Sequence, residues 1–132
     1  IENANKIKIT KELLIDTIQS DDLRLRIIIS NLLSNAIKYA DINKEEMFIS
    51  IKTYTEEGYN KIEITDNGIG IKDEFKNNIF EMYFGTNKNK GSGLGLYIVK
   101  EAVENIKGSI SVFSENTIGS KFIVAIPNYH GN

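Results

Sequence analysis

The chain has 132 residues, of which 41% are hydrophobic and 26% are charged, and this composition indicates one soluble globular domain. Sixteen Lys and Arg against eighteen Asp and Glu give a net charge of −2, so no basic field indicates a nucleic-acid partner. The sequence has no Cys and one His, His130, which excludes disulfides, thiol nucleophiles, Cys-ligated zinc and His-rich metal sites.

The first residue, Ile1, is not an initiator Met, so we expect a fragment of a longer protein or a processed one. No apolar run reaches the length of a membrane span, and no signal peptide opens the chain. We therefore expect no direct membrane contact by this domain, and we expect partners elsewhere on the same polypeptide.

The first predicted elements are a short edge strand at residues 7–10 and a long helix. Asp21 or Asp22 is a good helix N-cap, and the helical pattern ends near Tyr39. Between them, apolar residues recur at the spacing of an amphipathic helix: Leu25, Ile29, Leu32 and Ala36.

Two strand pairs are predicted from alternating apolar and polar residues. Residues 47–54 and 61–65 form the first pair, and residues 58–60 (Gly-Tyr-Asn) suggest a hairpin turn between them. Residues 109–114 and 121–126 form the second pair.

The segments between the strand pairs complete the predicted fold. Residues 73–84 suggest a short helix, and the polar residues 85–91 suggest a lid-like loop. Residues 94–106 predict a second amphipathic helix with Gly108 as its C-cap. This order of elements predicts an α/β two-layer sandwich, with the helices on one face of a mixed, mostly antiparallel sheet.

The first helix carries a polar row beside its apolar stripe. At about 100° per residue, the row falls within about a third of the circumference, and its members are Asn31, Asn35, Lys38 and Tyr39. An amide oxygen can ligate Mg²⁺ and a Lys can pair with phosphate oxygens, so this row suits a metal-bound polyphosphate. The alternative is a solvated helix face.

Residues 66–70 (Asp-Asn-Gly-Ile-Gly) follow a predicted strand. Gly68 and Gly70 permit a close approach of the backbone to a planar ligand, and Asp66 can accept a hydrogen bond from an exocyclic amine. The alternative is a plain Asp-Asn-Gly turn.

Residues 91–96 (Gly-Ser-Gly-Leu-Gly-Leu) open the second predicted helix. Clustered glycines at a helix N-terminus expose N–H groups that can bind phosphate. The cluster lacks the Gly-Lys-Ser/Thr of a P-loop and the preceding strand of a dinucleotide fingerprint. By itself the pattern is weak.

Taken together, these motifs resemble the ATP-binding catalytic domain of bacterial sensor histidine kinases, in the superfamily that includes gyrase, the large heat-shock ATPase chaperone and MutL-type repair proteins. The resemblance rests on an N box, a first glycine box, an F box, a second glycine box and a last glycine element, at residues 31–39, 66–70, 79–84, 91–96 and 119–122. It covers about residues 6–127, which we interpret as the ATP-binding catalytic domain. Residues 1–5 would be the trailing end of an upstream linker or helix, and residues 128–132 a C-terminal tail.

The resemblance implies ATP and Mg²⁺ as cofactors and gives roles to the polar row. Asn35 would ligate Mg²⁺, Asn31 would support that site, and Lys38 would contact phosphate. Tyr39 would cover the adenine or ribose, and Asp66 would read the adenine amine.

The resemblance also implies further nucleotide contacts. Gly70, a water and Ser120 would complete the adenine contact, and the glycines of the second box would let the lid close over the phosphates. Core packing would explain the apolar members equally well. The implied contacts are Gly68, Gly70, Ile71, Lys88, Lys90, Gly91, Gly93, Leu94, Gly95, Leu96, Ser120 and Phe122.

Position 31 and the lid bear on the type of reaction. ATP-hydrolysing relatives typically carry a Glu where this chain has Asn31, and an amide cannot act as a general base. This favours phosphoryl transfer to a nucleophile on another domain. Many relatives also carry an Arg after the F box, where Phe84 is followed here by Gly85. Lys88 and Lys90 are either substitutes for it or solvated lid charges.

The resemblance implies partners within a two-component phosphorelay. These are the protein's own upstream His-bearing dimerisation domain and the receiver domain of a response regulator, with no nucleic acid. We expect a monomeric isolated domain, a homodimeric full-length protein and a cytoplasmic location, with membrane anchoring of the whole kinase left open. The alternatives are a degenerate nucleotide-binding module that regulates a partner without phosphotransfer, and an ATPase of the same superfamily.

Overall fold

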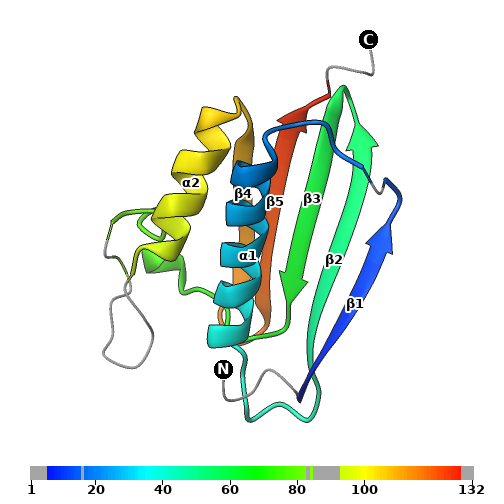
Figure 1. The fold of residues 1–132 in the computed structure, drawn as a ribbon. Helices are drawn as coiled ribbons and strands as arrows, with labels where there is room; N and C mark the ends of the chain where they lie inside the picture. The colour runs from blue at the N-terminus through cyan, green and yellow to red at the C-terminus, as the bar shows by residue number, and fades with distance from the viewer. Residues whose placement is uncertain (1–5, 16, 83, 85–92, 129–132) are drawn as a thin grey trace.

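The computed structural model describes residues 6–15, 17–82, 84 and 93–128 (Figure 1). The predicted upstream segment at residues 1–5, the lid at 85–91 and His130 lie outside the described residues. The helices and strands, in chain order, are β1 (Ile7–Leu13), α1 (Asp22–Lys38), β2 (Met47–Glu56), β3 (Tyr59–Asp66), a 3₁₀ helix (Asp73–Phe75), α2 (Gly95–Asn105), β4 (Ser109–Glu115) and β5 (Gly119–Pro127).

The strands form one mixed sheet in the order β1-β2-β3-β5-β4. β1 runs parallel to β2 at one edge, and the other neighbouring pairs are antiparallel. Figure 1 shows both helices against the same face of the sheet. The predicted α/β two-layer sandwich and its edge strand are therefore confirmed.

The core lies between the helices and the inward face of the sheet. Alternate residues of the central strands point inward, so that buried Ile62 of β3 pairs with buried Val124 of β5. Ile28 of α1 and Val99 of α2 are fully buried against this surface. At the start of α1, Asp21 is the N-cap, and its carboxylate accepts a hydrogen bond of 3.0 Å from the backbone N–H of Arg24.

No helix in the described ranges combines the length and the apolar character that crossing a bilayer requires.

The first hairpin turn begins one residue earlier than predicted and is one residue shorter. Glu57 and Gly58 form a two-residue turn with φ of 53° and 84°, the signs of a type I′ turn. Asn60 is already in β3, where its side chain is buried and accepts a hydrogen bond of 3.0 Å from Thr55 Oγ1. That pairing places it in the strand rather than in the turn.

The short helix predicted for residues 73–84 is wrong in extent. Of the described residues in this range, only Asp73–Phe75 is helical, and turns and a bend follow at residues 76–82. The aromatic side chains determine this path, because Phe75 packs on Phe84 with ring centroids 5.7 Å apart. Phe80 meets Phe122 edge to face at 6.3 Å.

The cap at the end of α2 also differs from the prediction, since Ile106 is the C-cap. Lys107 takes the left-handed conformation (φ 60°) expected of a glycine, and the N–H groups of Lys107 and Gly108 donate to Glu104 and Val103 in a Schellman motif. Gly108 is needed for space, because a Cβ there would lie 2.5 Å from the carbonyl oxygen of Ala125.

We predict that Ile28→Ala lowers the free energy of unfolding by about 2–5 kcal/mol, because it leaves a cavity between α1 and the sheet. The matched control is Leu23→Ala on the same helix, since Leu23 is 66% exposed and Ile28 is 0% exposed. Urea denaturation of both variants measures the difference. Equal losses would contradict this account of the core.

Candidate functional site

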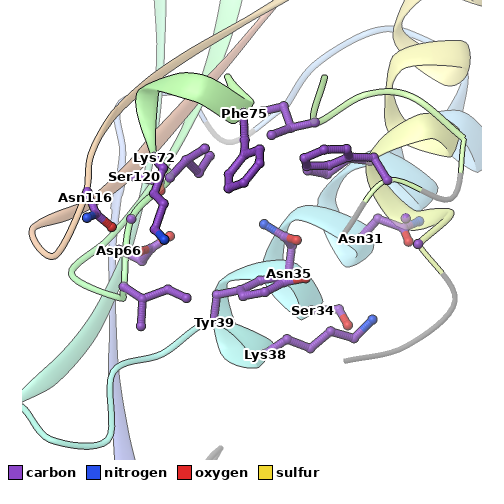
Figure 2. A pocket seen from close by; sticks show the side chains of 18 residues that line it. Asn31, Ser34, Asn35, Lys38, Tyr39, Asp66, Lys72, Phe75, Asn116 and Ser120 are labelled. Atoms are coloured by element: carbon purple, nitrogen blue, oxygen red, sulfur yellow. The ribbon is translucent and has the colours of Figure 1, made fainter. Parts of the chain in front are cut away.

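A cavity of about 390 Å³ opens between α1, the loop after β3 and the start of α2 (Figure 2). Residues far apart in the sequence meet in it. The predicted site residues that line it are Asn31, Asn35, Lys38, Tyr39, Asp66, Gly70, Ile71, Gly93, Gly95, Leu96 and Ser120.

The polar row of α1 forms one wall of the cavity, as Figure 2 shows. The side-chain amide of Asn31 donates a hydrogen bond of 2.8 Å to the carbonyl of Ile27, so it is held against its own helix. Its oxygen lies 3.4 Å from where a Cβ on Gly95 would be, which places it beside the first residue of α2. Burial raises the pKa of Tyr39, so its phenol stays protonated.

Asp66, the last residue of β3, forms the opposite wall (Figure 2). Its Oδ1 accepts a hydrogen bond of 2.8 Å from the N–H of Gly68. Burial raises the pKa of Asp66, while backbone N–H groups of Gly68 and Ser120 and the charge of Lys44 oppose that rise. The result is a half-buried carboxyl that faces the cavity and can accept a hydrogen bond from a ligand amine.

The loop after Asp66 is packed directly against other backbone segments. Gly70 has a φ of 73°, and a Cβ there would lie 2.0 Å from the carbonyl oxygen of Glu115. A Cβ on Gly68 would lie 2.3 Å from the carbonyl oxygen of Tyr39. Gly68 does not line the cavity, so its glycine is explained by this contact with the end of α1, and a nucleotide contact there stays a prediction.

A pair of serines supports the floor of the cavity. Ser114 Oγ accepts a hydrogen bond of 2.8 Å from the N–H of Ile71 and lies 2.9 Å from both the carbonyl of Gly119 and Ser120 Oγ. A hydroxyl has one proton, so all contacts are satisfied when Ser114 donates to Gly119 and accepts from Ser120. The Ser120 oxygen then keeps its acceptor capacity for a ligand or a water.

The other predicted residues lie elsewhere. Phe122 is only 2% exposed and packs in the core on Phe80 rather than in the cavity wall. Leu94 is the N-cap of α2, and its carbonyl accepts from the N–H of Ile98 at 2.9 Å. Lys88, Lys90 and Gly91 lie outside the described residues.

Several residues of the cavity wall were not among the predicted site residues. Ile79 and Phe84 belong to the F box, Ser34 to the N box and Ile69 to the first glycine box, so these motifs were the signal for them. Lys72, Phe75 and Asn116 carry no such signal, because only the fold brings their segments to the cavity. The full set is Ser34, Ile69, Lys72, Phe75, Ile79, Phe84 and Asn116.

The cavity offers an amide oxygen as a ligand for a metal ion. Among the described residues, no group of three or more His, Cys, Asp or Glu side chains could hold a metal ion. The side-chain amide of Asn35 does face the cavity (Figure 2). An amide oxygen is a ligand that Mg²⁺ accepts.

Comparison with known proteins gives one family. The family model described as "Histidine kinase-, DNA gyrase B-, and HSP90-like ATPase" matches residues 20–130. The sensor protein RprX of Bacteroides fragilis is 37% identical over 113 residues, covering 82% of this chain and 22% of that protein. The sensor histidine kinase RcsC of Escherichia coli K12 is 38% identical over 117 residues, covering 85% and 12%.

Solved structures agree with the sequence relatives. The mycobacterial sensor histidine kinase MprB superposes with a TM-score of 0.81 at 25% identity, covering 96% of this chain and 85% of that one. The catalytic domain of the histidine kinase ThkA gives a TM-score of 0.78 at 28% identity, covering 93% and 81%. The chain thus spans less than a quarter of the curated relatives above but most of these two solved chains.

We predict that the Asp66 carboxyl titrates above the ordinary range of an aspartate, because burial disfavours its charged form. Carboxyl-carbon NMR over a pH series measures this. Asp73 is an internal control, because its hydrogen bond to Lys76 lowers its pKa.

The raised pKa of Asp66 also determines how the stability of the fold changes with pH. A raised carboxyl pKa means that the contribution of Asp66 to stability is full below its unfolded-state pKa and is lost as pH rises through the folded-state pKa. If Asp66 titrated at or below Asp73, this account of its environment would be wrong.

Proposed function

Because this chain belongs to the family of histidine kinase-, DNA gyrase B- and HSP90-like ATPases and is a sensor histidine kinase catalytic domain, we propose that it binds Mg-ATP and transfers the γ-phosphoryl group to a His on a separate dimerisation domain. That group would then pass to an Asp of a response regulator. The observation that carries the proposal is the meeting of Asn35, Lys38 and Asp66 in one cavity.

The end of the cavity near Asp66 suits adenine. Its carboxylate is an acceptor for the exocyclic amine, and Ser120 adds an acceptor beside it. Ile71 and Leu96 supply apolar surface, and Tyr39 supplies a neutral aromatic ring for the faces of the base or ribose. Lys72 is the other charged residue at this end in Figure 2, and the one carboxylate beside apolar and neutral side chains favours a flat base that carries an amine.

The end near α2 suits the phosphates. Lys38 supplies a positive charge to phosphate oxygens, and the Asn35 amide oxygen would be one ligand of Mg²⁺. Gly93 and Gly95 line the cavity where α2 begins, and a helix N-terminus favours anions. The bound Mg²⁺ would neutralise charge on the phosphates during transfer.

The identity of residue 31 favours transfer over hydrolysis. Hydrolysis needs a base that orients water, and the amide of Asn31 is already committed to the carbonyl of Ile27. Asp66 is the only carboxyl among the described residues that line the cavity, and it lies at the base end. The acceptor imidazole needs no such base, because its unprotonated nitrogen attacks the γ-phosphorus directly while the bond to the β-phosphate oxygen breaks.

The remaining elements of the proposal follow from the family. The acceptor His would lie on an upstream dimerisation domain of the same protein, the full-length protein would be a homodimer, and this domain would lie in the cytoplasm. A second candidate is a nucleotide-gated module without phosphotransfer, and it is favoured by Gly85 standing where many relatives have an Arg.

We predict that Asp66→Asn weakens binding of ADP by about tenfold or more, since it removes a charged acceptor for the adenine amine. Asn35→Asp should change the Mg²⁺ dependence of ATP-analogue binding instead. Calorimetry measures both, and Asp22→Asn, at an exposed residue of α1 paired with Arg26, is the control. Unchanged affinity in both site variants would mean that the site is misplaced.

We predict that this chain, mixed with its upstream helical domain, Mg²⁺ and labelled ATP, produces acid-labile phosphohistidine. No label on the helical domain, with ATP binding intact, would contradict the kinase assignment. Inserting Arg between Phe84 and Gly85 then separates the candidates, because a large gain in transfer would identify the natural domain as a module without efficient phosphotransfer.

A further inference from the structure

The side chain of Lys44 makes contacts that the proposed nucleotide site does not explain. Lys44 lies in the loop between α1 and β2, and its ammonium donates to three backbone carbonyls. The oxygens of Asn67, Gly68 and Ile118 lie 2.6, 3.2 and 3.0 Å from Nζ. An ammonium has three protons, so its donor capacity is filled by these carbonyls.

These carbonyls belong to the two loops that shape the base end of the cavity. Asn67 and Gly68 directly follow Asp66, and Ile118 lies in the turn that leads to Ser120. Figure 1 shows the loop between α1 and β2 at the same end of the sheet as the end of β3. Lys44 therefore joins three loops at one point.

A cation is suited to this place because three carbonyl oxygens converge there. Their partial negative charges would repel one another without a positive centre between them. None of the ion pairs among the described residues includes Lys44, so its charge is directed at these carbonyls. The same charge also opposes the burial-driven rise in the pKa of Asp66.

Other contacts hold the same loop from a second side. The side chain of Asn67 accepts from the N–H of Phe48 at 2.9 Å and donates to the carbonyl of Glu46 at 2.8 Å. The N–H of Thr117 donates to the carbonyl of Ile69 at 2.7 Å. With Lys44 in place, the backbone on both sides of Gly68 is held, which restricts where the Asp66 carboxylate can point.

We propose that Lys44 is a positioning residue for base recognition, whose ammonium fixes the loop that carries Asp66 and thereby sets the preference for a base with an exocyclic amine. Lys44 is not among the residues that line the cavity, so it acts through Asp66 rather than on the nucleotide. This inference rests on the proposed function. Lys44 therefore affects the selectivity for the base and not the contacts to the phosphates.

The experiment compares affinities for ADP and IDP by calorimetry in the 132-residue chain. IDP carries a carbonyl oxygen where ADP has its amine, so a correctly placed Asp66 carboxylate rejects it. We expect Lys44→Met to reduce the ratio of ADP to IDP affinity by about tenfold. Lys44→Arg, which keeps the charge and several donors, should restore part of the ratio.

The control is Lys107→Met, which removes the same charge from an exposed residue that follows α2 and does not line the cavity. It should leave the ratio unchanged. If Lys44→Met does not fold, Lys44→Gln is measured in its place, and we expect the same reduction in the ratio of ADP to IDP affinity. A merely structural role would weaken binding of both nucleotides and keep their ratio.

The outcomes separate this inference from the proposed function. A wild-type preference for ADP that survives in Lys44→Met or Lys44→Gln overturns the role of Lys44 and leaves ATP binding in place. A wild-type chain that binds ADP no better than IDP contradicts adenine recognition itself, and with it the basis of this inference.

Discussion

The close contact between the Asp66 loop and its neighbouring backbone is the constraint on which the site depends. A Cβ on Gly70 would lie 2.0 Å from the carbonyl of Glu115, and one on Gly119 would lie 2.1 Å from the carbonyl of Asp66. Only glycine allows backbones to approach this closely. The approach brings the end of β3, the β4–β5 turn and the end of α1 together, and the base end of the cavity is the space that they enclose.

This packing also explains the electrostatics of the site. It partly removes Asp66 from water, which raises the pKa of its carboxyl, and the same loop supplies the N–H of Gly68 as a compensating donor. A carboxylate in this state is a stronger acceptor for a ligand amine than one in full contact with water. Burial of the Asp66 carboxylate is therefore unfavourable in the ligand-free domain, and a hydrogen bond from an amine-bearing ligand would offset that cost.

Much of the fold could be predicted because its signals are local. The period of the apolar residues located α1 and α2, and alternation located the strands, including inward-facing Ile62 and Val124. The extent of the short helix at 73–84 could not be predicted, because packing between aromatic side chains such as Phe75 and Phe84 determines that path.

The residues of the candidate site also divide into those that could be predicted from the sequence and those that could not. Motifs indicated Asn35 and Asp66, since their residue types and spacing carry chemistry. Lys44 and Ser114 could not be predicted because each acts through contacts with segments distant in the sequence, and Asn116 because only the fold brings its turn to the cavity. A Lys in a polar loop looks like any solvated Lys until the fold brings three carbonyls to its ammonium.

The distribution of charge along the cavity bears on why a separate acceptor would be needed. The described lining has its one carboxyl at the base end, whereas Lys38 and the amides of Asn31 and Asn35 form the other wall. Amides and ammonium groups can hold phosphates but cannot take a proton from water at neutral pH. On the proposed function, the nucleotide would be held without a group that activates water, so reaction would wait for an imidazole that needs no such activation. A domain built in this way would conserve ATP until its partner His arrives, and the amide at position 31 would then help to determine when the phosphoryl group moves.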